Sequence, residues 1–132
     1  MSAQPLVAIV DDDESVRESL PDLIRVLGFS IRVFSSAEQF LASGCVGQTR
    51  CLILDVAMPE MSGPDLQREL SRRGYRIPII FITALNDERL RAHVLEQGAV
   101  ECLFKPFSDS AMLEALTVAV RKGAAADHQD HV

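Results

Sequence analysis

Several side chains suited to phosphoryl chemistry directly follow apolar stretches of the sequence. Asp11 and Asp12 follow "LVAIV", Asp55 follows "CLIL", Thr83 closes "IPIIFIT", and Lys105 follows "VECLF". Carboxylate oxygens are ligands that suit Mg²⁺, and an aspartate can attack a phosphoryl group to form an aspartyl phosphate. A hydroxyl and an ammonium stabilise the negative oxygens during such a transfer. These residue types together predict metal-assisted phosphoryl transfer.

Simpler interpretations explain some of these residues but not the whole set. Asp13 and Glu14 continue the acidic run, and acids at this point are typical of a helix N-terminus. Asp55 has no such explanation, because a lone carboxylate behind a buried strand is costly. Thr83 or Lys105 alone is an ordinary residue. Their shared position after strand-like segments favours a common site.

The elements that must position these residues are short apolar runs alternating with helical patterns. Three of the runs are almost continuously apolar, as in strands buried on both faces. Strict alternation predicts an α/β fold with a parallel sheet and right-handed crossovers. In such a sheet, ligands bind at the carboxyl ends of the strands, where the polar residues above fall. The predicted strands are 6–10, 31–34, 51–55, 77–83 and 100–104.

The helical patterns carry start and stop signals. Pro21 lies inside the first pattern, where it removes a hydrogen bond to the Arg17 carbonyl, so we expect a bend there. The signals are Gly28 after the first helix, Ser36 with Gln39 as a capping box, Pro64 at a first helical position, Asn86 as a cap, and Ser108 before the last helix.

Length and composition indicate a single globular domain over residues 1–122 of the 132, with 123–132 as a flexible tail or the start of a linker. A net charge of −6, no Trp and one Tyr argue against direct nucleic-acid binding. Because the chain has no apolar stretch of about 20 residues and no signal-peptide pattern, we expect a cytoplasmic protein without membrane contact. Cys45, Cys51 and Cys102 show no CxxC spacing, and the last two fit buried apolar runs.

The motifs "VDDDESVR", "LDVAMPEMSG", "FITA" and "FKPF" resemble the receiver domain of bacterial two-component response regulators, and "SAEQFL" resembles its FixJ-like class. The resemblance covers roughly residues 5–122. It implies a doubly wound (βα)5 fold with helices on both faces of a parallel sheet of order 2-1-3-4-5. It also implies a cis bond before Pro106.

The resemblance also implies roles for individual residues. Asp55 matches the phosphoacceptor. Asp12 and Asp55 would bind Mg²⁺ by side chain and Ala57 by its backbone carbonyl, with Asp11 acting mainly through water. Thr83 and Lys105 match the residues that contact the phosphoryl group. A sensor histidine kinase would be the phosphoryl donor, and the domain would catalyse only its own phosphorylation and slow dephosphorylation, so it is not expected to be an enzyme.

The sequence departs from the family pattern at three positions. The family usually has an aromatic residue three positions before the lysine, which turns inward when the threonine moves, and this position is Cys102. The aromatic half of a switch between Thr83 and this position is therefore missing. Ala57 and Leu85 occupy the positions that usually tune dephosphorylation, and neither orients an attacking water. We expect a long-lived aspartyl phosphate.

Two outputs remain open at this point, and a function of a different class is the remote alternative. A phosphorylated receiver would act through the face of its fourth helix, fifth strand and fifth helix, with a homodimer through that face as a candidate assembly, to control transcription through a DNA-binding domain absent from this chain. A stand-alone receiver would act on a protein partner instead. A Mg²⁺-dependent phosphatase with an aspartate nucleophile would need a second acid at Ala57 and a cap domain, and the sequence has neither.

Overall fold

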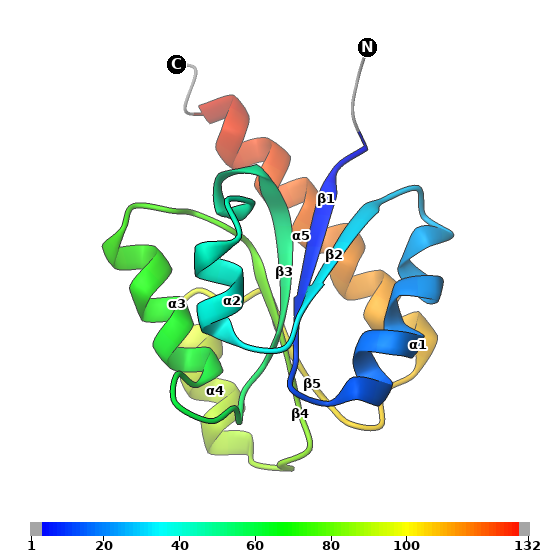
Figure 1. Cartoon of the computed structure of the whole chain (residues 1–132), viewed down its shortest axis with the longest axis vertical. Helices are drawn as coiled ribbons and strands as arrows, with labels where there is room; N and C mark the ends of the chain where they lie inside the picture. The colour runs from blue at the N-terminus through cyan, green and yellow to red at the C-terminus, as the bar shows by residue number, and fades with distance from the viewer. Residues whose placement is uncertain (1–3, 130–132) are drawn as a thin grey trace.

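A computed structural model describes residues 4–129, with side-chain surroundings for residues 4–122. Its five parallel strands form one sheet of order β2-β1-β3-β4-β5, as predicted (Figure 1). The strands are β1 (Leu6–Val10), β2 (Ser30–Phe34), β3 (Thr49–Asp55), β4 (Ile79–Thr83) and β5 (Glu101–Phe104). The helices are α1 (Glu14–Arg25), α2 (Ala37–Ala42), α3 (Gly63–Arg72), α4 (Glu88–Glu96) and α5 (Asp109–Gln129), with a 3-10 turn at Val46–Gln48.

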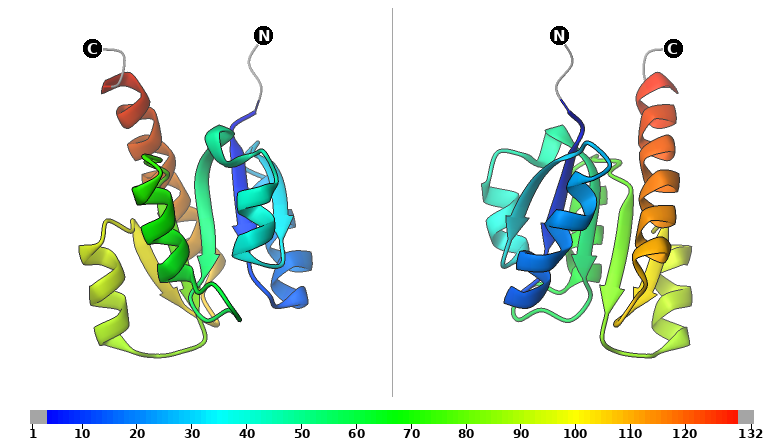
Figure 2. Two further views of the ribbon diagram at one scale, coloured as in Figure 1. Left: turned by 60° about the vertical axis from the view of Figure 1, so that its left-hand side comes forward. Right: turned by 90° about the vertical axis from the view of Figure 1, so that its right-hand side faces the viewer.

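Two apolar cores lie on opposite faces of the sheet. One core packs Phe40 of α2, Leu66 of α3 and Val94 of α4 against the sheet. The other packs Ile24 of α1 and Leu116 of α5 against the opposite face. Both views in Figure 2 show α1 and α5 on one side of the sheet, with the remaining helices on the other. The sheet therefore has helices packed on both faces.

The strand register brings the predicted polar residues to one edge of the sheet. Val10 pairs with Leu54, so Asp11 follows β1 beside the end of β3. Asp55 pairs with Ile82, and Thr83 pairs with Phe104, the residue before Lys105. Because parallel strands all point the same way, their carboxyl ends meet at this edge.

The helix boundaries confirm most of the predicted signals and correct two. Pro64 lies in the first turn of α3, and the Ser108 hydroxyl accepts a hydrogen bond from Ala111 N at 3.0 Å. Asn86 is not the cap of α4. Asp87 is, because its carboxylate accepts hydrogen bonds from Arg89 N and Leu90 N, and a carboxylate at a cap also interacts favourably with the helix dipole.

The second correction concerns α2. Ser36 caps this helix by accepting a hydrogen bond from Gln39 N at 3.1 Å, as predicted. The reciprocal contact of a capping box is displaced by one residue, since the Gln39 side-chain oxygen accepts from Ser35 N and from the Ser35 hydroxyl, both at 2.9 Å. The start of α2 is thus held by two serines.

The C-terminal ends of two helices differ from those that the sequence pattern predicts. Helix α1 ends at Arg25, before Leu27, and Gly28 has φ 86°. Helix α5 continues to Gln129, beyond the point where the sequence loses helical periodicity. Residues 130–132 lie outside the described part. No helix among the described residues is long and apolar enough to cross a membrane.

Candidate functional site

Three carboxylates gather at the carboxyl end of the sheet. One oxygen each from Asp11, Asp12 and Asp55 lies within 4.8 Å of the others. Asp11 is fully buried and Asp55 is 5% exposed, whereas Asp12 is exposed. The sequence prediction that these acids meet is confirmed. The cluster is open to solvent on the Asp12 side.

Asp11 is locked in place by contacts to all of its polar groups. Its Oδ1 accepts a hydrogen bond from Asp13 N, and its Oδ2 accepts one from Lys105 Nζ, both at 2.9 Å. Its backbone N–H donates to Phe34 O at 3.1 Å, and its carbonyl accepts from the Arg17 guanidinium at 2.9 Å. These contacts fix the position of the Asp11 carboxylate beside Asp55 and Lys105.

Arg17 is a residue whose role sequence reasoning missed. It belongs to the quoted "VDDDESVR" motif, but its position on a helix gave no sign that it would reach back to the loop. In the structure it joins α1 to the Asp11 carbonyl. Arg17 lies six residues after Asp11, so its side chain reaches back along the first turn of α1 to the Asp11 carbonyl.

The remaining acids of the run begin a helix, as predicted. Asp13 is the N-cap of α1, and its Oδ1 accepts hydrogen bonds from Ser15 N at 2.9 Å and from the Ser15 hydroxyl at 2.8 Å. These hydrogen bonds lower the pKa of Asp13. Glu14 is the first residue of the helix. The acidic run is thus divided between a carboxylate cluster and a helix cap.

The electrostatics of the cluster favour a cation. Burial, followed by the charge of Asp11, raises the pKa of Asp55 to about 7, although Lys105 opposes this change. Lys105 Nζ lies 2.9 Å from Asp11 Oδ2 and 3.8 Å from Asp55 Oδ1. Burial lowers the pKa of Lys105, but the hydrogen bond and charge of Asp11, together with the charges of Asp55 and Asp13, outweigh it and raise the pKa overall. One ammonium cannot neutralise three carboxylates, so the donor set is compatible with a divalent cation.

Thr83 and Lys105 lie at the ends of adjacent strands. Thr83 is fully buried, and its Oγ1 accepts a hydrogen bond from Leu85 N at 3.0 Å. Lys105 N donates to Thr83 O at 2.7 Å, which fixes the start of the β5–α5 connection. The peptide bond between Lys105 and Pro106 is cis, in agreement with the resemblance. Asp55 and Thr83 therefore end their strands, and Asp11, Asp12 and Lys105 directly follow theirs, all at the same edge of the sheet.

Cys102 lies in β5 and belongs to the core below α4. It is 2% exposed, and its burial raises the pKa of the thiol to about 11. Two side chains hydrogen-bond to the backbone of Cys102. Arg91 Nε donates to its carbonyl at 3.2 Å, and Glu101 Oε1 accepts from its N–H at 2.9 Å. Arg91 also donates to Glu101 at 2.9 Å. This connection between α4 and β5 was not predicted from the sequence.

Gly63 sets the approach of α3 to the site. A Cβ atom at this position would lie 2.4 Å from the Asp55 carbonyl oxygen and 2.9 Å from a ring carbon of Phe81. The Gly63 N–H donates to Val56 O at 2.9 Å. Ala57 is exposed in the same loop. Glycine therefore permits the close contact that positions the segment after Asp55.

The fold and the cluster define a doubly wound α/β domain with a carboxylate site at the carboxyl ends of its strands. The family model of the response regulator receiver domain matches residues 7–117. The chain belongs to this family. Domains of the family serve as receivers in two-component systems, where histidine kinases phosphorylate them, and they generally act as signalling domains.

The relatives of this chain include proteins named as response regulators and as transcriptional regulatory proteins. Nodulation protein W of Bradyrhizobium diazoefficiens is 41% identical over 121 residues, which are 92% of this chain and 53% of that protein. Response regulator protein TodT of Pseudomonas putida is 43% identical over 116 residues, covering 88% and 51%. The solved structure of FixJ-N has a TM-score of 0.79 at 36% identity and covers 92% of this chain and 96% of that one, so the chain is similar to the FixJ-like class. The chain spans about half the length of the curated relatives it matches.

Proposed function

We propose that Asp55 is the phosphoacceptor of this receiver and that a sensor histidine kinase supplies the phosphoryl group. The observation that carries the proposal is the position of Asp55, a buried carboxylate at the end of the central strand, beside two further acids and Lys105. In the transfer, an Asp55 carboxylate oxygen forms a bond to phosphorus. The bond between phosphorus and the histidine nitrogen breaks, and the electron pair stays with the imidazole.

The residues of this chain that would hold Mg²⁺ are Asp12 and Asp55 by side chain and Ala57 by its backbone carbonyl. When bound, Mg²⁺ neutralises the phosphoryl oxygens and the acids around them. Both Asp11 oxygens already accept hydrogen bonds, from Asp13 N and Lys105 Nζ. This supports a role for Asp11 through water rather than as a direct ligand.

Lys105 and Thr83 would recognise the phosphorylated state. The Lys105 ammonium, now 3.8 Å from Asp55, would pair with a phosphoryl oxygen, and the Thr83 hydroxyl would donate a hydrogen bond to another. Thr83 Oγ1 accepts from Leu85 N. A shift of the Thr83 side chain would therefore pull on the segment that leads into α4.

The aspartyl phosphate is expected to be long-lived. Ala57 and Leu85 flank the site, both are exposed, and neither side chain can orient a water for attack. Radiolabelled phosphoprotein, purified from its donor, should keep its label over minutes. Loss of label within a few seconds would contradict this part of the proposal.

The output is proposed to pass through the face of α4, β5 and α5, with a second copy of the chain as one possible partner. The resemblance to the FixJ-like class, whose members include transcriptional regulatory protein FixJ of Rhizobium meliloti, supports control of transcription by a DNA-binding domain outside residues 1–132. Residues 1–122 would then form the receiver unit, with 123–132 leading into a linker. A stand-alone receiver acting on a protein partner is the alternative.

The proposal is tested by phosphoryl uptake from acetyl phosphate or from a phosphorylated kinase in the presence of Mg²⁺. Asp55→Asn should abolish uptake. Asp13→Asn is a matched control, because it removes one charge from the same acidic run while asparagine still caps the helix. Uptake that persists in Asp55→Asn would identify a different acceptor.

A further inference from the structure

A pocket of about 290 Å³ lies at the end of the domain opposite the acid cluster. Its wall includes Ile79, the first residue of β4, whereas Thr83 ends this strand at the acid cluster. At about 3.3 Å per residue, roughly 13 Å of strand separates the two sites. The pocket is therefore distinct from the site proposed for phosphorylation.

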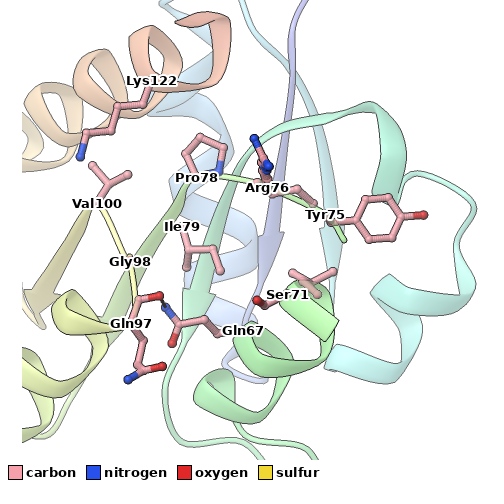
Figure 3. Close-up of a pocket in the computed structure, with 12 residues that line it drawn as sticks. Gln67, Ser71, Tyr75, Arg76, Pro78, Ile79, Gln97, Gly98, Val100 and Lys122 are labelled. Carbon is pink, nitrogen blue, oxygen red and sulfur yellow. Dashed lines mark hydrogen bonds between the residues drawn. The ribbon is translucent and has the colours of Figure 1, made fainter. Parts of the chain in front are cut away.

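The pocket has a cationic side and an amide side. Figure 3 shows Lys122 and Arg76 on either side of Pro78, whereas Gln67 and Gln97 lie together below Ile79. The charged residues that line the pocket within the described chain are Arg76 and Lys122, both cations, in a protein with a net charge of −6. Lys122 forms no ion pair with any described residue.

The amide side connects two helices. Gln67 of α3 is 8% exposed, and its Nε2 donates to Val94 O at 3.4 Å and to Gln97 O at 3.3 Å. Both carbonyls belong to the C-terminal end of α4. Both hydrogens of Nε2 are used in these contacts, so Gln67 holds the C-terminal end of α4 against α3.

We propose that this pocket binds a small organic carboxylate and thereby holds the C-terminal end of α4. The carboxylate group would pair with Lys122, Arg76 would add positive charge to the same end of the pocket, and an apolar body would lie over Ile79 and Leu70. The pocket is close to the lower end of the usual volume range for ligand sites, roughly 300–1,000 Å³, so a compact molecule fits best.

The ligand would act on the switch through α4, and this effect rests on the proposed function. Helix α4 begins after Asp87, near Thr83, and ends beside the pocket. A ligand that packs against Gln97 and Gly98, which follow α4 and line the pocket, favours the position of α4 seen here. By linkage, a change of α4 on phosphorylation would weaken carboxylate binding, and the carboxylate would oppose phosphorylation.

Binding is tested with benzoate as the probe and benzamide as its neutral counterpart, by titration of the ¹⁵N-labelled chain followed by NMR. Benzoate should shift the side-chain amides of Gln67 and Gln97 and the backbone amide of Gly98, with benzamide much weaker. Lys122→Gln should weaken benzoate binding roughly tenfold, since an ion-paired hydrogen bond is lost. Arg121→Gln, which removes the neighbouring charge outside the pocket, should leave binding unchanged.

Three results would overturn the site: equal binding of benzamide and benzoate, equal binding by Lys122→Gln and the wild type, or benzoate shifts confined to the acid cluster. Asp55→Asn keeps the pocket and should bind benzoate normally, so binding is measured independently of the proposed function. For the effect on α4, benzoate should slow phosphoryl uptake in the wild type but not in Lys122→Gln. Binding without that difference would refute the connection to the switch.

Discussion

From the carboxylate cluster we predict how Asp55→Asn changes the stability of the domain, which can be measured without a kinase. Asp55→Asn replaces a buried carboxylate by a neutral amide of nearly the same shape. Burial and the charge of Asp11 raise the pKa of Asp55 from its usual 3.8 to about 7. The folded domain therefore disfavours ionised Asp55 more than the unfolded chain does, and the variant should be the more stable protein at neutral and alkaline pH.

The magnitude and its pH dependence follow from this change in pKa. At about 1.4 kcal/mol per pKa unit, ionising Asp55 in the folded domain costs up to about 4 kcal/mol. Movement of Lys105 towards Asp55 offsets part of this cost, so we expect a gain of about 2–4 kcal/mol at pH 8. Below pH 3.8 Asp55 is protonated in both states and the two proteins should differ little. The difference should grow as the pH rises to about 7 and then level off.

The assay is urea unfolding of both proteins between pH 4 and pH 8, with and without Mg²⁺. Mg²⁺ should stabilise the wild type by about 2.7 kcal/mol at a concentration of 100 times its Kd, and Asp55→Asn much less, because a ligand has been removed. A variant that is less stable than the wild type at pH 8 without Mg²⁺ would refute the electrostatic reasoning. Equal stabilisation of both proteins by Mg²⁺ would remove Asp55 from the metal site.

Three further substitutions test the loop that follows Asp55, each by urea unfolding. Gly63→Ala should cost more than about 3 kcal/mol, because its Cβ would overlap the Asp55 carbonyl. Gly47→Ala is the control and should cost about 1 kcal/mol or less, because its Cβ would lie 3.8 Å from a ring carbon of Tyr75. Glu60→Gly should stabilise by about 0.5–1 kcal/mol, since Glu60 has φ 68°, and a loss would show that its side chain makes a necessary contact. Ser62→Ala should cost about 1 kcal/mol by removing the cap that accepts from Asp65 N, and Ser62→Asn should restore most of it.

The sheet and its polar edge were predictable from the sequence because their signals are local. Near-continuous apolar runs such as 51–54 identify buried strands, and a carboxylate directly after such a run has to lie at a strand end. Chain alternation then predicts a parallel sheet. The predicted strand 77–83 begins two residues too early, because Ile77 and Pro78 are apolar but precede the β4 ladder.

Two of the contacts that the sequence did not predict join different elements of the fold. Gln67 looks like an ordinary surface residue of a helix, yet it is buried against α4, 27 residues away from its partner Val94. Arg91 reaches Cys102 in the same way. A helical pattern shows which residues face the core, but not which backbone carbonyls of a neighbouring helix lie opposite them. Such polar contacts depend on the packing of the finished fold.

The position of Lys105 suggests how the acid cluster responds to phosphorylation despite the missing aromatic residue at Cys102. In the structure Lys105 donates to Asp11 at 2.9 Å and lies farther, at 3.8 Å, from Asp55. A phosphoryl group on Asp55 would carry more negative charge than the Asp11 carboxylate, so Lys105 should change its main partner from Asp11 to that group. The backbone N–H of Lys105 donates a hydrogen bond to Thr83 O. A movement of Lys105 would therefore act on the ends of β4 and β5 together. The change of partner would therefore reach both strands beside α4 without an aromatic side chain.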